Sequence, residues 1–92
     1  MRIVISYDIS DDKRRRKVAK IMEGYGYRVQ YSVFECDLEP KQLAELKKRL
    51  KPLVKEEEWE SIRFYPLYTE CAENAQVLGK DLRKILGPVV VI

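Results

Sequence analysis

The apolar residues of this chain repeat with two different spacings, and the order of these spacings constrains the fold more than any other feature of the sequence. Residues 3–9 alternate between apolar and polar or small types and are rich in β-branched and aromatic side chains, which is typical of a strand. A stripe with helical spacing follows and predicts a helix over about 11–24. Gly24 and Gly26 supply the turn conformations that end this helix.

Three further segments continue the alternation of strand and helix. Residues 27–38 alternate again, and they form either one long, bent strand or two short strands joined by a tight kink. A stripe of leucines, opened by Pro40, predicts an amphipathic helix over 40–55. The acidic residues 56–58 then form a solvated loop, and the strand pattern returns over 61–69.

The last quarter of the chain leaves two alternatives. Residues 75–78 form a short strand that ends at Gly79, or residues 73–86 form a helix that this glycine interrupts. Residues 89–92 are an apolar tail, which would invite edge pairing if it stayed exposed. We therefore expect the tail to complete a sheet, that of a partner subunit.

The order β-α-β-α-β with short connections predicts an α/β (α+β) architecture: one sheet with both helices on one face, a ferredoxin-like βαββαβ sandwich. The 92 residues form a single domain, 1–92. A chain of this length buries only about 60% of its unfolded surface, so a second copy would enlarge a small core. We expect a homodimer in which residues 70–92 take part. No apolar run approaches the roughly 18 residues of a membrane span, so we expect no membrane partner. The apolar stretch at the N-terminus is too short for the core of a signal peptide, so we expect a cytoplasmic protein.

The residue types that are missing restrict the chemistry. The chain has no histidine, which excludes serine–histidine and cysteine–histidine nucleophile pairs and histidine metal sites. Cys36 and Cys71 lie far apart without a CxxC spacing, so we expect two buried hydrophobic residues rather than a disulfide scaffold or zinc site. Catalysis would have to use carboxylates, hydroxyls, lysines or an oxygen-bound metal.

A basic run in the first predicted helix is the most informative local feature. Residues 13–20 contain six basic side chains and no acid, a charge of +6 against +3 for the whole chain. The run is either a solvated helix face or a surface that binds phosphodiesters. Adjacent cations repel one another, and arginine suits bidentate phosphate contacts, so we favour the second interpretation. The candidate binding residues are Arg14, Arg15, Arg16 and Lys17.

Asp8 is the carboxylate that stands out, because it ends a strand of otherwise apolar or small residues. It either caps the following turn or acts as an oxygen ligand for Mg²⁺, which needs only one or two carboxylates and otherwise keeps water or takes phosphate oxygens. One carboxylate per chain makes a sparse site. Two copies of Asp8 brought together across a dimer axis would make a fuller one.

The segment Tyr7-Asp8-Ile9, the basic helix, Gly26 and the run over 28–36 together resemble the CRISPR-associated endoribonuclease family, the small universal protein of spacer acquisition. The resemblance is strong over about the first 40 residues. It implies a ferredoxin-like homodimer to which the C-terminal strands contribute. It also implies a catalytic metal, Mg²⁺ or alternatively Mn²⁺, held by Asp8.

Other positions of the family's site carry over by the same resemblance. Its supporting residues fall at Tyr7, Ser32 and Phe34, and its basic positions fall at Arg15 and Arg28. Lys17 stands where an arginine is common, which keeps the charge but loses the planar fork.

Two functions are consistent with these residues. The first is metal-dependent hydrolysis of phosphodiester bonds in RNA or DNA, with Asp8 of both chains at the metal and with Arg15 and Arg28 on neighbouring phosphates. The alternative is a dimeric adaptor without chemistry of its own, which bridges copies of the CRISPR integrase and supports duplex DNA on its basic helices.

Overall fold

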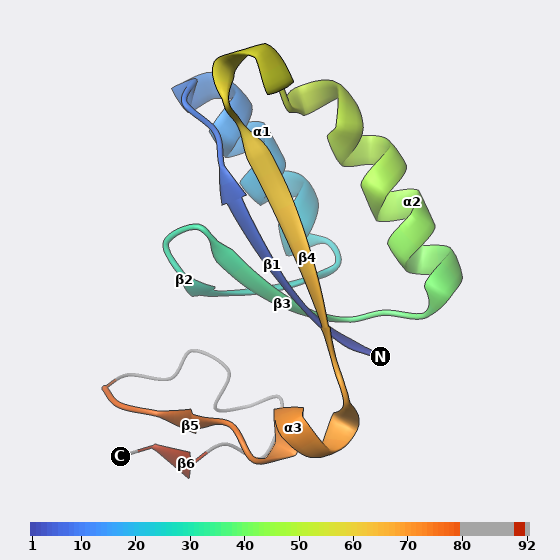
Figure 1. Ribbon diagram of the computed structural model, residues 1–92, viewed down its shortest axis with the longest axis vertical. Helices are drawn as coiled ribbons and strands as arrows, with labels where there is room; N and C mark the ends of the chain where they lie inside the picture. Colours follow the sequence, from blue (N-terminus) through green and yellow to red (C-terminus); the bar gives the residue numbers. More distant parts are fainter. Residues whose placement is uncertain (80–89, 92) are drawn as a thin grey trace.

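The computed structural model describes residues 1–79 and 90–91 of the chain (Figure 1). In chain order the elements are β1 (Arg2–Asp8), α1 (Asp12–Glu23), β2 (Gly26–Gln30), β3 (Val33–Asp37), α2 (Pro40–Leu50), the short 3₁₀ helices η1 (Lys51–Leu53) and η2 (Glu56–Glu58), β4 (Ser61–Leu67), α3 (Thr69–Glu73), β5 (Gln76–Val77) and β6 (Val90–Val91). None of the described helices is both long enough and apolar enough to cross a membrane.

Strands β1 to β4 form one antiparallel sheet in the order β2-β3-β1-β4. Ile5 of β1 pairs with Phe34 of β3 on one side and with Phe64 of β4 on the other. The first and third strands are thus neighbours at the centre, and the second and fourth form the edges. This order confirms the predicted ferredoxin-like βαββαβ fold.

Helices α1 and α2 cover the same face of the sheet (Figure 1). The alternating residues of β1 that face them are buried, whereas the residues between them are exposed or half-buried. The core of buried apolar residues comprises Ile3, Ile5, Tyr7, Ile9, Val18, Ala19, Met22, Phe34, Cys36, Leu38, Leu46 and Leu50. The period-2 and helical patterns of the sequence therefore lead to one shared core, and the other face of the sheet carries Asp8.

Several element boundaries differ from those predicted. Residues 27–38 form two strands, β2 and β3, so the alternative of two short strands is confirmed. The helix is shorter than the one predicted over 40–55: α2 ends at Leu50, because the ring of Pro52 cannot continue an α-helix and the chain tightens into η1. The predicted loop 56–58 is the 3₁₀ helix η2.

The described residues of the C-terminal part decide between the strand and helix alternatives, and they leave the predicted pairing of the tail with a partner subunit untested. β4 ends at Leu67, two residues before the predicted end, and α3 follows. The short-strand alternative for 75–78 is confirmed by β5, so a continuous helix over 73–86 is wrong where the chain is described. β6 pairs in parallel with β5 of its own chain. Completion of a partner's sheet by this tail remains a prediction, and Val89 and Ile92 lie outside the described residues.

Candidate metal and nucleic-acid site

Asp8 is the last residue of β1 and its side chain is exposed. It pairs in register with Ser61 of β4, at the end of the sheet where the chain turns into α1. It makes no ion pair or side-chain hydrogen bond in the described part of the chain. Its carboxylate is therefore free to bind a cation or a phosphate-bound metal.

A single chain supplies few other ligands for such a metal. Within residues 1–79 and 90–91 no three Asp, Glu, Cys or His side chains cluster closely enough to hold an ion. Mg²⁺ tolerates one or two carboxylates with water in its remaining positions, so the donor set fits that ion only as part of an open site. A second copy of Asp8 would give the site two carboxylate ligands.

The turn between β2 and β3 lies at the same end of the sheet as Asp8. The backbone N–H of Tyr7 donates to the carbonyl oxygen of Ser32 at 3.0 Å, and the Tyr7 hydroxyl lies 3.4 Å from the carbonyl oxygen of Tyr31. The structure thus places half-buried Ser32 beside the residue that precedes Asp8. Sequence reasoning found no turn signal in this segment.

The aromatic residues proposed to support the site are part of the core. Tyr7 is 5% exposed and Phe34 is completely buried, and their ring centroids lie 6.3 Å apart. Both residues can hold the end of β1 in place by packing. Neither ring is available to stack on a nucleic-acid base.

Arg28 lies on the other face of the sheet from Asp8. It pairs with Phe34, which pairs with Ile5, so its side chain belongs to the face that the helices cover. Its guanidinium carbon stands 5.4 Å from the centre of the Phe34 ring, a cation–π distance. Its Nε is buried and has no hydrogen-bond partner among the described residues. In a single chain, Arg28 and Asp8 are therefore not brought together.

Arg15 is held at the junction between β1 and α1. Its Nη1 donates to the carbonyl oxygen of Ile9 at 3.1 Å, and its Nη2 pairs with Asp12. The hydrogen bond to Asp12 raises the pKa of Arg15 above its usual value. The Arg15 side chain is 28% exposed, and Ile9 is the residue next to Asp8. Arg15 is thus the basic side chain that the fold anchors beside the candidate metal ligand.

Arg14, which was predicted from the sequence to bind nucleic acid, is paired with carboxylates in the structure, and its binding role stays a prediction. Its side chain is 15% exposed and forms ion pairs with Glu60, at 2.8 Å, and with Glu58, at 2.9 Å. It also donates to the carbonyl oxygen of Leu53 at 3.0 Å. The hydrogen bond to Glu60 raises the pKa of Arg14, so the guanidinium stays charged. A phosphate at Arg14 would have to compete with the carboxylates of Glu58 and Glu60.

Glu60 is the buried partner of this network, with a side chain only 1% exposed. Its carboxylate accepts hydrogen bonds from the Ser10 N–H at 3.0 Å, the Ser10 hydroxyl at 2.7 Å and the Lys55 N–H at 3.0 Å. Together with Arg14, whose contribution is the largest, these donors hold the pKa of Glu60 well below its usual range. Glu60 was not identified from the sequence, because it follows the acidic run over 56–58 closely and nothing in the sequence distinguishes this buried, ion-paired carboxylate from the exposed ones.

Four cations of α1 remain on the surface. They are exposed and have no ion pair within the described part of the chain: Lys13, Arg16, Lys17 and Lys20. Arg16 and Lys17 were predicted to bind nucleic acid, and the structure leaves both accessible. This exposed basic face of α1 carries four positive charges and can attract a phosphodiester backbone.

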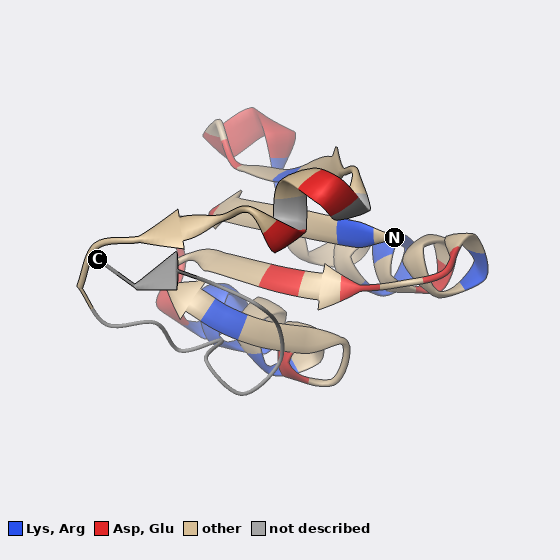
Figure 2. Ribbon diagram, turned by 90° about the horizontal axis from the view of Figure 1, so that it is seen from below, with Lys and Arg blue, Asp and Glu red and all other residues tan. Residues whose placement is uncertain are grey.

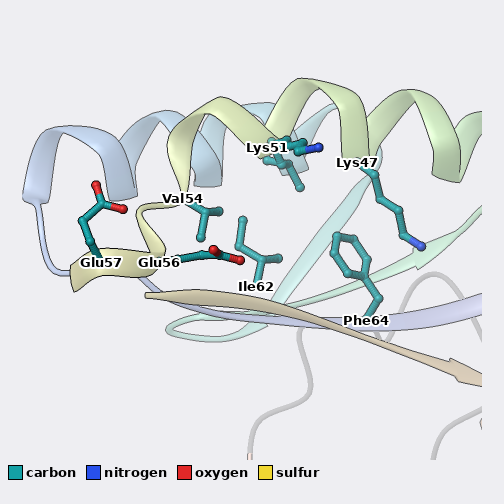
Figure 3. Close-up of a pocket in the computed structure, with 8 residues that line it drawn as sticks. Lys47, Lys51, Val54, Glu56, Glu57, Ile62 and Phe64 are labelled. Atoms are coloured by element: carbon teal, nitrogen blue, oxygen red, sulfur yellow. The ribbon is translucent and has the colours of Figure 1, made fainter. Parts of the chain in front are cut away.

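A groove that the sequence did not indicate lies between α2 and β4 (Figure 3). It has a volume of about 520 Å³. Its lining residues are Lys47, Leu50, Lys51, Val54, Glu56, Glu57, Ile62 and Phe64. None of the residues predicted to be functional lines it, so the groove is separate from the candidate metal site.

The chain is similar to one protein family over most of its length. The family model described as CRISPR associated protein Cas2 matches residues 1–75. The relative named CRISPR-associated endoribonuclease Cas2 3, from Synechocystis sp., is 49% identical over 89 residues, which cover 96% of each chain. The CRISPR-associated endoribonuclease Cas2 of Thermus thermophilus is 49% identical over 87 residues, which cover 94% of this chain and 92% of that protein.

Solved structures share the fold. The crystal structure of Streptococcus pyogenes Cas2 superposes with a TM-score of 0.75 at 38% identity, over 86% of this chain and 100% of that one. A chain in a structure described as a partial Cas6-RT-Cas1–Cas2 complex superposes with a TM-score of 0.68 at 30% identity, over 95% of this chain and 93% of that one.

Proposed function

The chain belongs to the CRISPR-associated Cas2 family, and from this premise we propose that it acts in spacer acquisition as a homodimeric, metal-dependent endonuclease. The reaction is hydrolysis of a phosphodiester bond in RNA or in duplex DNA. The observation that carries the proposal is the position of Asp8: an exposed, unpaired carboxylate at the end of β1, beside the basic helix α1. The names of the relatives, which call them endoribonucleases, support the reaction class.

Asp8 of each protomer would hold the metal, Mg²⁺ or Mn²⁺. A bound divalent cation supplies a water of lowered pKa and stabilises charge on the scissile phosphate. Arg15, anchored at the carbonyl oxygen of Ile9, is positioned to contact a neighbouring phosphate, and exposed Arg16 and Lys17 extend the basic track along α1. Arg28, whose side chain lies on the opposite face of the sheet from Asp8 in a single chain, would join them only in an assembly that brings that face to the substrate.

A cleavage assay tests the catalytic part of this proposal. Labelled RNA and duplex DNA are incubated with wild-type protein or Asp8→Asn, in Mg²⁺, Mn²⁺ or EDTA. We expect EDTA and Asp8→Asn each to abolish cleavage. Because the Asp8 side chain is exposed, its substitution should leave the melting temperature of the protein unchanged. Cleavage by Asp8→Asn at the wild-type rate in Mg²⁺ would refute the role of Asp8.

A binding assay tests the basic surface. The double variant Arg16→Glu/Lys17→Glu should weaken the binding of duplex DNA. It should also make the binding constant less sensitive to salt: the slope of log K against log[salt] should become shallower by about 0.9 for each phosphate that the variant no longer neutralises. The matched control is Lys41→Glu/Lys48→Glu, which reverses two exposed cations on α2. Equally weakened binding in both double variants would show that net charge, and not the face of α1, determines binding.

The second candidate function is a non-catalytic adaptor that bridges the CRISPR integrase, Cas1, and supports duplex DNA. Two observations favour it: one structural neighbour comes from a complex that includes Cas1, and no cluster of metal-ligating side chains accompanies Asp8 among the described residues. Spacer acquisition in cells separates the two functions. An adaptor predicts that Asp8→Asn acquires spacers normally while Arg16→Glu/Lys17→Glu does not. Equal failure of both variants would contradict a purely architectural role.

A further inference from the structure

Trp59 follows η2 and has two unusual properties for a tryptophan. Its side chain is 91% exposed, more than any other large apolar side chain of the described residues. Its backbone is left-handed, with φ 59° and ψ 29°, and it is the only described residue other than glycine with a positive φ. Glycine adopts this conformation far more readily, and bulky residues rarely do. Neither core packing nor backbone preference explains a tryptophan at this position.

The loop that carries Trp59 is braced on both sides. The N–H of Trp59 donates to the carbonyl oxygen of Glu56 at 3.0 Å, and the N–H of Glu60 donates to that of Lys55 at 3.3 Å. The buried Glu60 carboxylate, next in the chain, binds Ser10 and Arg14. The backbone that carries the exposed indole is therefore held in a fixed position, which lowers the entropy cost of binding to a partner.

Acidic residues precede Trp59 in the chain, and they border a groove with a mixed apolar and charged lining. η2 is the distant red turn in Figure 2. Glu56 and Glu57 are exposed and have no ion pair among the described residues, whereas Glu58 is occupied by Arg14. Glu56 and Glu57 also form one end of the groove in Figure 3, which Ile62 and Phe64 line with apolar side chains. Lys47 and Lys51 of the same lining lie on its α2 side. We call Glu56, Glu57, Trp59 and this groove the tip surface.

We propose that the tip surface is a protein-docking site for a partner that presents arginine or lysine next to apolar side chains. The inference rests on the second candidate function, the adaptor, in which that partner is the integrase Cas1. Glu56 and Glu57 repel phosphates, so a phosphodiester is better suited to the exposed basic face of α1 than to the tip surface. A cation of the partner pairs with Glu56 and Glu57 or lies over the indole, while its apolar residues enter the groove. Tryptophan is enriched among the residues that dominate binding energy at such interfaces.

Affinity measurements with full-length proteins test this site. Purified Cas1 from the same CRISPR system is titrated with wild-type chain, Trp59→Gly and the control Tyr68→Ala, which removes another aromatic side chain, 84% exposed. We expect Trp59→Gly to weaken binding about thirtyfold or more, and Tyr68→Ala to change it less than about threefold. Because glycine fits the left-handed backbone, Trp59→Gly should melt no lower than wild type, which separates a binding defect from a folding defect.

Charge reversal gives an independent readout. Glu56→Lys/Glu57→Lys should slow association with Cas1 and abolish its acceleration at low salt. The matched control, Glu23→Lys/Glu70→Lys, reverses two exposed carboxylates outside the tip surface. It should leave the rate of association and its dependence on salt unchanged. Duplex DNA binding should be no weaker than wild type in the tip variants.

Several results would overturn the inference. Trp59→Gly binding Cas1 within about twofold of wild type would remove the tip from the interface and leave the proposed function intact. A loss of DNA binding in Trp59→Gly would assign the indole to base stacking, and a loss of the homodimer would assign it to a contact between copies. If wild type itself does not bind Cas1, the adaptor function fails and the inference fails with it.

Discussion

Substitution of Gly26 by alanine tests how tightly β2 is packed against β3. Gly26 pairs with Cys36, and a Cβ on Gly26 would lie 2.2 Å from the carbonyl oxygen of Glu35, 2.5 Å from Cys36 Sγ and 2.9 Å from Cys36 Cα. Two of these atoms belong to the backbone of β3 and cannot rotate away. Alanine therefore forces the two strands apart at the start of β2, two residues before Arg28.

The cost of this change should be near the top of the range for overpacking, about 3 kcal/mol, because backbone atoms and not flexible side chains must move. A domain of this size has a total stability of roughly 5–14 kcal/mol. The melting temperature falls by about 4–8 °C for each kcal/mol in domains of 60–100 residues. We therefore expect Gly26→Ala to melt roughly 12–24 °C below wild type.

Thermal unfolding followed by circular dichroism measures the effect, and Gly24→Ala is the matched control. A Cβ on Gly24 would lie 3.3 Å from the Ile21 carbonyl oxygen, and Gly24 has φ −78°, which alanine adopts without strain. The control should stay within about 1 kcal/mol of wild type. A melting temperature of Gly26→Ala that matches the Gly24→Ala value would refute the close approach of β2 and β3.

Two further predictions concern buried ionisable groups. Because Arg14 lowers the pKa of Glu60 in the folded chain, the ionised carboxylate stabilises the fold above its unfolded pKa of about 4.3, and this stability is lost as the pH falls below that value. Urea midpoints of wild type and Glu60→Gln should therefore converge as the pH is lowered from about 7 to about 3, and parallel curves would contradict the ion pair. Burial raises the pKa of the Cys36 thiol to about 11, whereas Cys71 is exposed. Ellman's reagent should react rapidly with one thiol in the native protein and two in denaturant, and two fast native thiols would show that Cys36 is accessible.

Elements with a clear hydrophobic period could be predicted from the sequence. The alternation over 3–9 and the helical stripe after it predicted β1 and α1 within a residue or two, and the order of elements predicted the fold. Asp8 stood out as well, because a carboxylate at the end of an apolar strand departs from the local pattern. The prediction that Cys71 is buried is wrong, because no period supports its assignment to a core face.

The candidate site depended on contacts between residues far apart in the chain. Arg14 and Arg16 look alike in a run of cations, yet Arg14 meets Glu60, 46 residues away, and Arg16 remains exposed. For the same reason the sequence does not indicate that Glu60 is buried, since the acidic residues that precede it are exposed. The position of Arg28 on the opposite face from Asp8 follows from strand pairing and not from spacing.

The sequence by itself determined where strands and helices form, because the period of the apolar residues reports which face of each element is buried. It also determined the excess of positive charge on α1 and the absence of histidine chemistry. Only the tertiary structure decided which cations are free, which carboxylate is buried and that Trp59 stands exposed on a braced turn. Those properties depend on tertiary contacts between side chains that are far apart in the sequence, and the local periodicity of apolar residues carries no information about such contacts.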